Sequence, residues 1–135
     1  MRIVLDTNVL VSGTGWKGGA PARIIDAWSA QQFEIVVSRE VFEEYSRVLT
    51  QLSERHPGID AEPVLALVAS KAIWVTPVTL GGHICTDPDD DMFIAAAVGG
   101  KARYIVSGDR ALLAVCSFQG VDILTPARFI AVLPH

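Results

Sequence analysis

The sequence predicts an α/β fold with a central, mostly parallel sheet of about five strands. Short runs of β-branched and aliphatic residues alternate with longer segments that carry apolar residues at helical spacing. The short runs are apolar throughout, which is typical of strands that are buried on both faces. A length of 135 residues suits one domain with a substantial core. We therefore expect a single domain over residues 1–135, built from βαβ units.

Each element has its own local signal. The expected strands are the apolar runs at residues 3–5, 33–37, 73–75, 104–106 and 121–124. Helices are expected where a capping residue or a proline precedes apolar residues at helical spacing, and they begin at Pro21, after Ser38, at Asp60, at Asp87-Pro88 and at Thr125-Pro126. We expect turns at the glycine pairs 18–19, 81–82 and 99–100, and a flexible segment at 13–15.

Charge and hydropathy exclude two kinds of function. With 15 acidic and 11 basic residues the net charge is −4, so a nucleic-acid binder that relies on a broad cationic surface is not expected. The longest uncharged apolar stretch, residues 92–100, is far shorter than the roughly 18 residues that a membrane-spanning helix needs. We therefore expect a cytoplasmic protein that does not bind membranes.

The apolar content predicts a partner surface. Half of the residues are hydrophobic, which is more than one modest core readily hides. Trp16, Trp28 and Trp74 suit such a surface, although each of them taken singly is expected in the core. Cys85 and Cys116 lack the spacing of a metal site or a disulfide framework and are expected to be two buried thiols.

Two expected strands are followed by aspartates. Asp6 comes directly after the first strand, and Asp109 comes shortly after the strand at 104–106. Because parallel strands deliver their following loops to one edge of a sheet, the two carboxylates are expected at the same rim. Either aspartate taken alone could instead be a turn residue or a helix N-cap.

The helix after Ser38 offers three glutamates, which helical geometry separates. At about 100° per residue, Glu43 and Glu40 point away from the apolar stripe, whereas Glu44 borders it. Glu44 is therefore the glutamate that can reach a site beside the sheet. The alternative is a solvated flank residue that pairs with Arg47 or another surface cation.

The segment TDPDDDMFIAAAV holds the densest charge in the chain. Asp87 as N-cap, with Asp89 and Asp90 in the first turn, complements the positive end of a helix dipole. Asp91 is expected at about the fourth helical position, facing inward at the mouth of an apolar helix. Neighbouring carboxylates repel one another, and no Lys or Arg lies between residues 85 and 98. A hard divalent cation, Mg²⁺ or Mn²⁺, is the expected counter-ion.

Other catalytic motifs are missing or out of place in the sequence. It contains no G-x-x-x-x-G-K-[ST] and no G-x-S-x-G, and the run at 13–18 that fits G-x-G-x-x-G does not directly follow the expected strand at 3–5, as a phosphate-binding loop would. His56, His83 and His135 are unrelated in spacing, so roles as ligand or general base are not expected of them. The acidic residues therefore remain the main candidates for chemistry.

Four blocks occur in order along nearly the whole chain: IVLDTNVLVS, SREVFEEYSRVL, DPDDDMFIAAAV and ARYIVSGDRALL. Together they make the sequence resemble the PIN-domain family, and within it the VapC-like ribonucleases that are the toxins of bacterial toxin–antitoxin systems. The resemblance implies a three-layer α/β/α PIN-like fold and a metal-dependent ribonuclease site.

The resemblance also assigns site residues. It implies that four acids are catalytic and bind the metal: Asp6, Glu44, Asp91 and Asp109. It further implies supporting roles for Asn8 and Ser107, and it leaves Asp87 and Asp90 as supporting acids, either of which could replace Asp91 as ligand. The chain departs from the family pattern at Tyr45, where a smaller aliphatic residue is common, and this leaves the width of the pocket open.

By resemblance, the reaction is hydrolysis of RNA phosphodiester bonds by water that Mg²⁺ or Mn²⁺ activates. The implied partners are an RNA substrate, a small cognate antitoxin protein and a second copy of the chain in a homodimer. Lys17, Arg23 and Arg110 are available to contact the RNA backbone. The alternative is a non-catalytic PIN-like protein-interaction module. An aspartate-based phosphatase or phospho-receiver fits less well, because Lys71 and Lys101 precede their strands.

Overall fold

The computed structural model describes residues 1–15 and 18–134. The strands are β1 (Arg2–Leu5), β2 (Glu34–Val37), β3 (Ile73–Trp74), β4 (Tyr104–Val106), β5 (Ser117–Phe118) and β6 (Val121–Leu124). The helices are α1 (Thr7–Gly15), α2 (Gly19–Ser29), α3 (Arg39–Arg55), α4 (Ala61–Lys71), α5 (Asp91–Gly99), α6 (Arg110–Leu113) and α7 (Pro126–Val132), with a 3₁₀ turn (Pro88–Asp90) before α5. Trp16, Lys17 and His135 lie outside the described residues.

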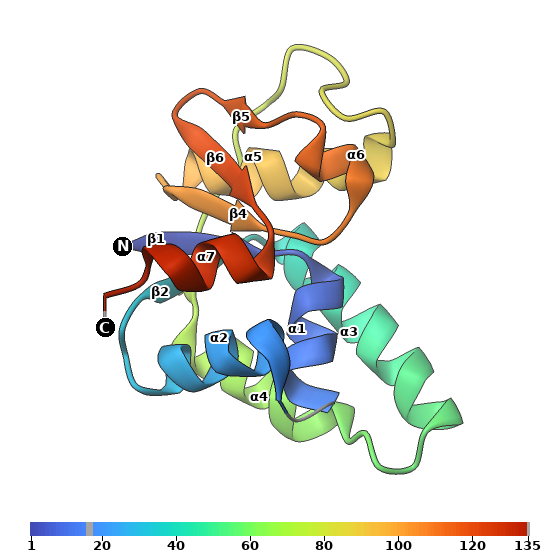
Figure 1. The fold of residues 1–135 in the computed structure, drawn as a ribbon. Helices are drawn as coiled ribbons and strands as arrows, with labels where there is room; N and C mark the ends of the chain where they lie inside the picture. The colour runs from blue at the N-terminus through green and yellow to red at the C-terminus, as the bar shows by residue number, and fades with distance from the viewer. Residues whose placement is uncertain (16–17, 135) are drawn as a thin grey trace.

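The strands form one sheet in the order β3-β2-β1-β4-β6-β5 (Figure 1). Neighbouring strands are parallel, apart from the antiparallel pair of β5 and β6. From β1 the chain adds β2 and β3 on one side, and it then crosses to place β4 on the other side of β1. The strand order therefore reverses between β1 and β4. In open α/β sheets this reversal opens a crevice at the carboxyl ends of the strands, where ligands bind.

The predicted strands are confirmed, and the structure adds a sixth. The additional strand, β5, turns back onto β6 through Gln119 and Gly120, which have φ angles of 47° and 84°. Two successive residues with positive φ are typical of the tight type I′ turn that joins hairpin strands. The mostly parallel sheet thus ends in a short hairpin at one edge.

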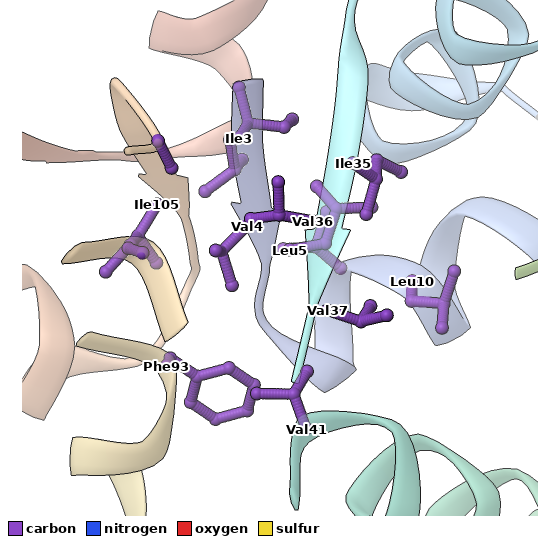
Figure 2. Packing of buried hydrophobic residues seen from close by; sticks show 14 of the residues in the cluster. Ile3, Val4, Leu5, Leu10, Ile35, Val36, Val37, Val41, Phe93 and Ile105 are labelled. Carbon is purple, nitrogen blue, oxygen red and sulfur yellow. The ribbon is translucent and has the colours of Figure 1, made fainter. Parts of the chain in front are cut away.

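The central strands form the core of the molecule. Figure 2 shows the side chains of β1 and β2 packed together, with Leu10 of α1 on one side and Phe93 of α5 beside Val41 of α3 on the other. The helices α5 and α7 lie on opposite faces of the sheet (Figure 1). Phe129 of α7 packs edge-on against Tyr104 of β4, with 6.0 Å between the ring centroids. Helices therefore cover both faces of the sheet.

The expected flexible segment at 13–15 is instead the last turn of α1. A Cβ atom at Gly13 would lie 2.5 Å from the Ile25 side chain and 2.6 Å from the carbonyl oxygen of Pro21. Both of these residues belong to α2, so glycine is what allows the two helices to approach so closely. Packing between helices thus overrides the weak helix propensity of this segment.

The cysteines and tryptophans only partly match the burial that the composition led us to expect. Both cysteines are free, but only Cys85 is buried, whereas Cys116 is exposed. Trp28 is buried, while Trp74 is 48% exposed and stacks on Phe42 with 5.1 Å between ring centroids. Within the described ranges, none of the helices is long and apolar enough to cross a membrane.

Candidate active site

Asp6 lies at the carboxyl end of β1, beside the end of β4. Its backbone N–H donates to the carbonyl of Val106 at 2.9 Å, and its own carbonyl accepts from Val9 and so begins α1. Its side chain is buried, and the hydroxyl of Ser107 donates to Oδ2 at 2.6 Å. The same hydroxyl accepts from the backbone N–H of Asp109 at 2.9 Å. Ser107 therefore links the two strand-end aspartates.

The carboxyl group of Asp109 has two neighbours, the first turn of α6 and the side chain of Asp90. One carboxylate oxygen accepts from the N–H of Leu112 at 3.2 Å and caps α6, which is the structural role that any strand-end aspartate can take. The side chain of Asp90, from the 3₁₀ turn, lies close enough to this carboxyl group for Asp109 to contribute to the raised pKa of Asp90. The topology thus brings Asp6, Asp90 and Asp109 to one rim.

Among the described residues no Lys or Arg forms an ion pair with Asp6, Asp90 or Asp109, so the electrostatics of this rim are those of an acidic cluster. Burial, then the hydrogen bond with Asp109 and the charges of Asp109, Asp6 and Asp87, raise the pKa of Asp90 to about 7. Burial also raises the pKa of Asp6; the hydrogen bond from Ser107 partly offsets this effect, and the charges of Asp109 and Glu44 add to it. The ionised forms of these carboxyl groups are therefore unfavourable here, and a bound cation would stabilise them.

Glu44 stands at the edge of the same cluster. Its side chain is 19% exposed, against 64% for Glu43, as the helical geometry predicted. Its charge reaches Asp6, yet its carboxylate also forms an ion pair with Arg47 one turn along α3. Both sequence-based interpretations of Glu44 therefore apply, because the side chain borders the acidic cluster and is partly neutralised by a surface cation.

Asp91 faces a different part of the structure. We expected it at about the fourth helical position, facing inward. Instead, Pro88–Asp90 form a 3₁₀ turn and α5 begins at Asp91 itself. Its carboxylate accepts from the backbone N–H groups of Cys85 at 2.8 Å and Ile84 at 3.2 Å, and it lies 3.4 Å from Nδ1 of His83. Burial opposes these contacts, but the hydrogen bonds prevail and lower the pKa of Asp91.

Asp91 therefore pins the loop before α5, while its neighbour Asp90 joins Asp109. Beside Asp91, burial and then the hydrogen bond to Asp91 raise the pKa of the Cys85 thiol to about 12. This keeps the thiol protonated at neutral pH and unsuited to act as a nucleophile. Asp87 is exposed and caps the 3₁₀ turn by accepting from the N–H of Asp89 at 3.0 Å.

Three further residues of the motif blocks, Asn8, Thr7 and Tyr45, differ in how deeply they are buried. Asn8 is exposed in the first turn of α1. Thr7, which sequence reasoning passed over, is buried, and its hydroxyl has no hydrogen-bond partner among the described residues. Tyr45 is buried in the core instead of lining a pocket, and its hydroxyl donates to the carbonyl of Leu5 at 2.5 Å. Tyr45 therefore does not set the width of the site.

The cluster can be tested for its fit to a metal ion. Among the described residues, no three Asp, Glu, His or Cys side chains converge closely enough to enclose an ion by themselves. Mg²⁺, however, is commonly held by one or two carboxylates and keeps several waters. The raised pKa of Asp90 beside Asp109, and the buried hydroxyl of Thr7 next to Asp6 in the chain, both suit such an open, partly hydrated site. The residues present therefore fit a hard divalent cation.

The basic residues named from the sequence are dispersed. Arg110 directly follows Asp109 as the first residue of α6, and is exposed. Arg23 lies on α2, where it lines a cavity of about 380 Å³ beside α7. Lys17 falls outside the described residues. Of the basic residues, Arg110 is thus adjacent to Asp109 in the chain, and Arg47 is linked to the edge of the acidic cluster by its ion pair with Glu44.

Taken together, the topology and the cluster define an α/β protein with an acidic centre at the reversal point of its sheet. The chain belongs to the PIN-domain family, since the model of that family, the PIN domain, matches residues 2–111. The match spans every element from β1 into α6 and contains all the acidic residues described above.

The chain is also similar to one further protein in sequence and to two solved structures in fold. The chain is 26% identical over 118 residues to the uncharacterized protein MJ1680 of Methanocaldococcus jannaschii, a match that covers 85% of this chain and 75% of that protein. Its fold is similar to that of VapBC2 from Rickettsia felis, solved bound to a DNA fragment from their promoter, with a TM-score of 0.58, 12% identity and coverage of 91% and 97% of the two chains. It is also similar to FitAcB from Neisseria gonorrhoeae, with a TM-score of 0.56, 14% identity and coverage of 93% and 98%.

Proposed function

We propose that this protein is a metal-dependent endoribonuclease and the toxin of a toxin–antitoxin pair. The observation that carries the proposal is the meeting of Asp6, Asp90 and Asp109 at the reversal point of the sheet, with pKa values raised for Asp6 and Asp90. Membership of the PIN-domain family supports nuclease activity. The sequence blocks shared with VapC-like toxins, and the fold shared with VapBC2 and FitAcB, support the toxin role and a small antitoxin partner.

In this proposal one or two carboxylates from the set Asp6, Asp90 and Asp109 would hold each Mg²⁺ or Mn²⁺ ion together with waters, with Glu44 at the edge. The bound metal would supply an activated water and positive charge for hydrolysis of an RNA phosphodiester bond. Ser107 holds Asp6 and Asp109 in a fixed relation through its two hydrogen bonds. Asp90 replaces Asp91 in the ligand set suggested by the resemblance, because the carboxylate of Asp91 is committed to the loop.

The decisive experiment substitutes Asp6 by Asn in the full chain and measures cleavage of single-stranded RNA with Mg²⁺ present and after its removal by EDTA. We expect cleavage to be lost in Asp6→Asn while the fold is kept or becomes more stable, since the change relieves charge repulsion in the cluster. Asp26→Asn, an exposed aspartate on α2, is the matched control and keeps full activity. Undiminished cleavage by Asp6→Asn would remove this residue from the mechanism.

Calorimetric titration with Mn²⁺ separates the nuclease from a non-catalytic interaction module. The nuclease binds Mn²⁺ in a way that Asp6→Asn and Asp109→Asn weaken, whereas a module shows no binding that depends on these carboxylates. Co-purification with the product of the neighbouring reading frame, followed by mapping of cleavage sites on total RNA, tests the antitoxin partner and identifies the RNA target. Sedimentation of the purified chain tests the proposed homodimer.

A further inference from the structure

Three basic side chains gather at the amino end of β1, at the edge of the sheet opposite the acidic cluster. The guanidinium of Arg2 donates through Nη1 to the carbonyl of Gly100 at 3.2 Å, and Lys101 is the next residue in the chain. The backbone N–H of Arg103 donates to the carbonyl of Arg2 at 2.8 Å. Arg2, Lys101 and Arg103 are therefore neighbours, and we call them the amino-edge patch.

The amino-edge patch is a local excess of positive charge in a chain whose net charge is −4. Lys101 and Arg103 are exposed, and the side chain of Arg2 is 41% exposed. Within the described ranges, the ion pair that the patch forms is that of Arg2 with Glu34, at 3.8 Å. Lys101 follows α5 and complements the negative end of its helix dipole, but this effect does not account for the two arginines beside the strands. Positive charge is thus left over for a partner.

Both arginines of the patch are restrained before any partner binds. The guanidinium of Arg103 lies over the ring of Tyr104, at 5.4 Å from the ring centroid, and its Nε donates to the Tyr104 hydroxyl at 3.0 Å. The hydrogen bond to Gly100 restrains Arg2. A restrained guanidinium loses less side-chain entropy on binding, and its planar fork matches the oxygens of a phosphate group. The patch therefore suits a partner that carries phosphates.

We propose that the amino-edge patch binds the phosphate backbone of the RNA substrate at a distance from the cleavage site. The inference rests on the proposed function for the identity of the ligand. Arg2 begins β1 and Asp6 directly follows it, so about 13 Å of strand separates the patch from the acidic cluster. Figure 1 shows the N-terminus at one end of β1 and helix α1 at the other.

This separation selects the kind of RNA that can use the patch. Helices cover both faces of the sheet, so an RNA that reaches both ends of β1 has to run around a layer of helices (Figure 1). It must therefore extend well beyond the bond that is cleaved. The patch is expected to favour long or folded RNA over short oligonucleotides.

The test is fluorescence anisotropy of a labelled, folded RNA with the full-length chain in EDTA, over a range of KCl concentrations. EDTA prevents metal-dependent cleavage and leaves the binding that does not need the metal. Each phosphate contact contributes about 0.7–0.9 to the slope of log affinity against log salt concentration. We expect Arg103→Gln and Lys101→Asn each to lower this slope by about that amount. Asparagine is chosen because it tolerates the φ angle of 55° at Lys101.

Arg55→Gln is the matched control. It removes the same charge from an exposed arginine at the end of α3, far from the N-terminus in Figure 1, and we expect the wild-type slope. Arg103→Lys keeps the charge and loses the planar fork, so it should keep the slope while weakening the affinity. A slope in Arg103→Lys as low as in Arg103→Gln would overturn a phosphate contact at this position.

Cleavage in the presence of Mg²⁺ supplies a second readout. The ratio of kcat/KM for the folded RNA to kcat/KM for a trinucleotide should fall in Arg103→Gln, through a higher KM for the folded RNA. Wild-type slopes in both Arg103→Gln and Lys101→Asn overturn this inference and leave the nuclease proposal standing. A chain that cleaves no RNA, but binds it through the patch, contradicts the proposed function alone. If the two variants weaken the binding of duplex DNA and not of RNA, the inference is wrong.

Discussion

Asp90 and Asp91 are neighbours in the chain, yet the structure gives them opposite roles. Burial, and then the neighbouring Asp109, disfavour the ionised form of Asp90, whereas Asp91 is stabilised by the backbone N–H groups of the loop before α5. The charge of Asp90 therefore costs stability in the metal-free protein, and the charge of Asp91 contributes to it. The same chemical change at the two positions should separate these roles.

We predict opposite effects for Asp90→Asn and Asp91→Asn. At pH 7.5 without metal, Asp90→Asn raises the melting temperature because it removes charge repulsion, and it weakens Mg²⁺ binding by about tenfold or more. Asp91→Asn lowers the free energy of unfolding by about 1–3 kcal/mol, because the loop loses an acceptor with full charge, and it leaves Mg²⁺ affinity nearly unchanged. Thermal denaturation and calorimetric titration measure both. If Asp91→Asn weakens Mg²⁺ binding as much as Asp90→Asn, then Asp91 is a ligand.

The raised pKa of Asp90 also predicts how stability depends on pH. The folded state binds the proton of Asp90 up to about pH 7, whereas an ordinary aspartate releases it near 3.8. Between these values the folded state holds more protons than the unfolded state, so stability is lost as the pH rises through this window. We expect the metal-free protein to be less stable at pH 8 than at pH 5 in urea denaturation.

Two comparisons check that the pH effect comes from this cluster. The loss of stability between pH 5 and pH 8 should shrink in Asp90→Asn, and it should shrink in the wild-type chain when Mg²⁺ is added. The lowered pKa of Asp91 acts below 3.8 and so lies outside this window. A slope that is identical in the wild-type chain and Asp90→Asn would show that Asp90 ionises normally.

Residue by residue, the sequence predicts only part of the candidate site. The placement of Asp6 and Asp109 at one rim follows from their positions after parallel strands, and the half-buried position of Glu44 follows from helical spacing. The sequence does not decide whether Asp90 or Asp91 joins Asp6 and Asp109. That depends on whether the turn after Asp87 is a 3₁₀ turn, which has i→i+3 hydrogen bonds, or an α-helical turn, which has i→i+4 bonds. The burial of Tyr45 and its hydrogen bond to Leu5 likewise do not follow from a local pattern, because they depend on a contact across 40 residues of chain.

Among the elements, α1 matters most for the site because it begins directly after Asp6. Its close packing on α2 depends on Gly13, whose missing side chain leaves room for the carbonyl of Pro21. We predict that Gly13→Ala lowers the free energy of unfolding by about 1–3 kcal/mol, because the added methyl group forces the two helices apart. Chemical denaturation measures the change.

Gly58→Ala is the control for this prediction. No atom lies within 4 Å of the position that a Cβ would take at Gly58, so the added methyl group meets open space there. We expect its stability to remain within about 0.5 kcal/mol of the wild-type value. Equal stability of the two variants would mean that α1 and α2 separate at little cost.

The elements themselves were predictable where a local pattern specifies them. The five predicted strands follow from short-range signals, although β3 is not buried as expected. The caps at Ser38, Asp60 and Thr125 also follow from such signals, and each of these three side chains accepts a hydrogen bond from the backbone of its helix. The helix α1 was not predictable, since β-branched residues and glycines disfavour it and only packing on α2 compensates. The strand β5 has two residues, too few for periodicity to reveal.

At the scale of the whole molecule, the net charge of −4 and the acidic centre oppose the approach of RNA. We predict that a fluorescently labelled single-stranded RNA binds the chain weakly in EDTA and much more tightly with Mg²⁺, since the metal supplies the positive charge that attracts phosphate. Stopped-flow anisotropy, recorded before cleavage proceeds, measures this difference. Asp109→Asn should reduce the gain. Equally tight binding in EDTA would place the RNA on a surface remote from the acidic cluster.

The hydrogen bond between Ser107 and Asp6 joins residues that are 101 positions apart in the chain. A ribosome therefore produces the whole stretch from the first strand to β4 before Ser107 and Asp109 exist to meet that strand. Fragments that end before this point, through a premature stop codon or proteolysis, keep the aspartate of β1 but have nothing to complete the centre around it. Synthesis itself thus delays the appearance of an assembled centre until the residues after β4 have been translated.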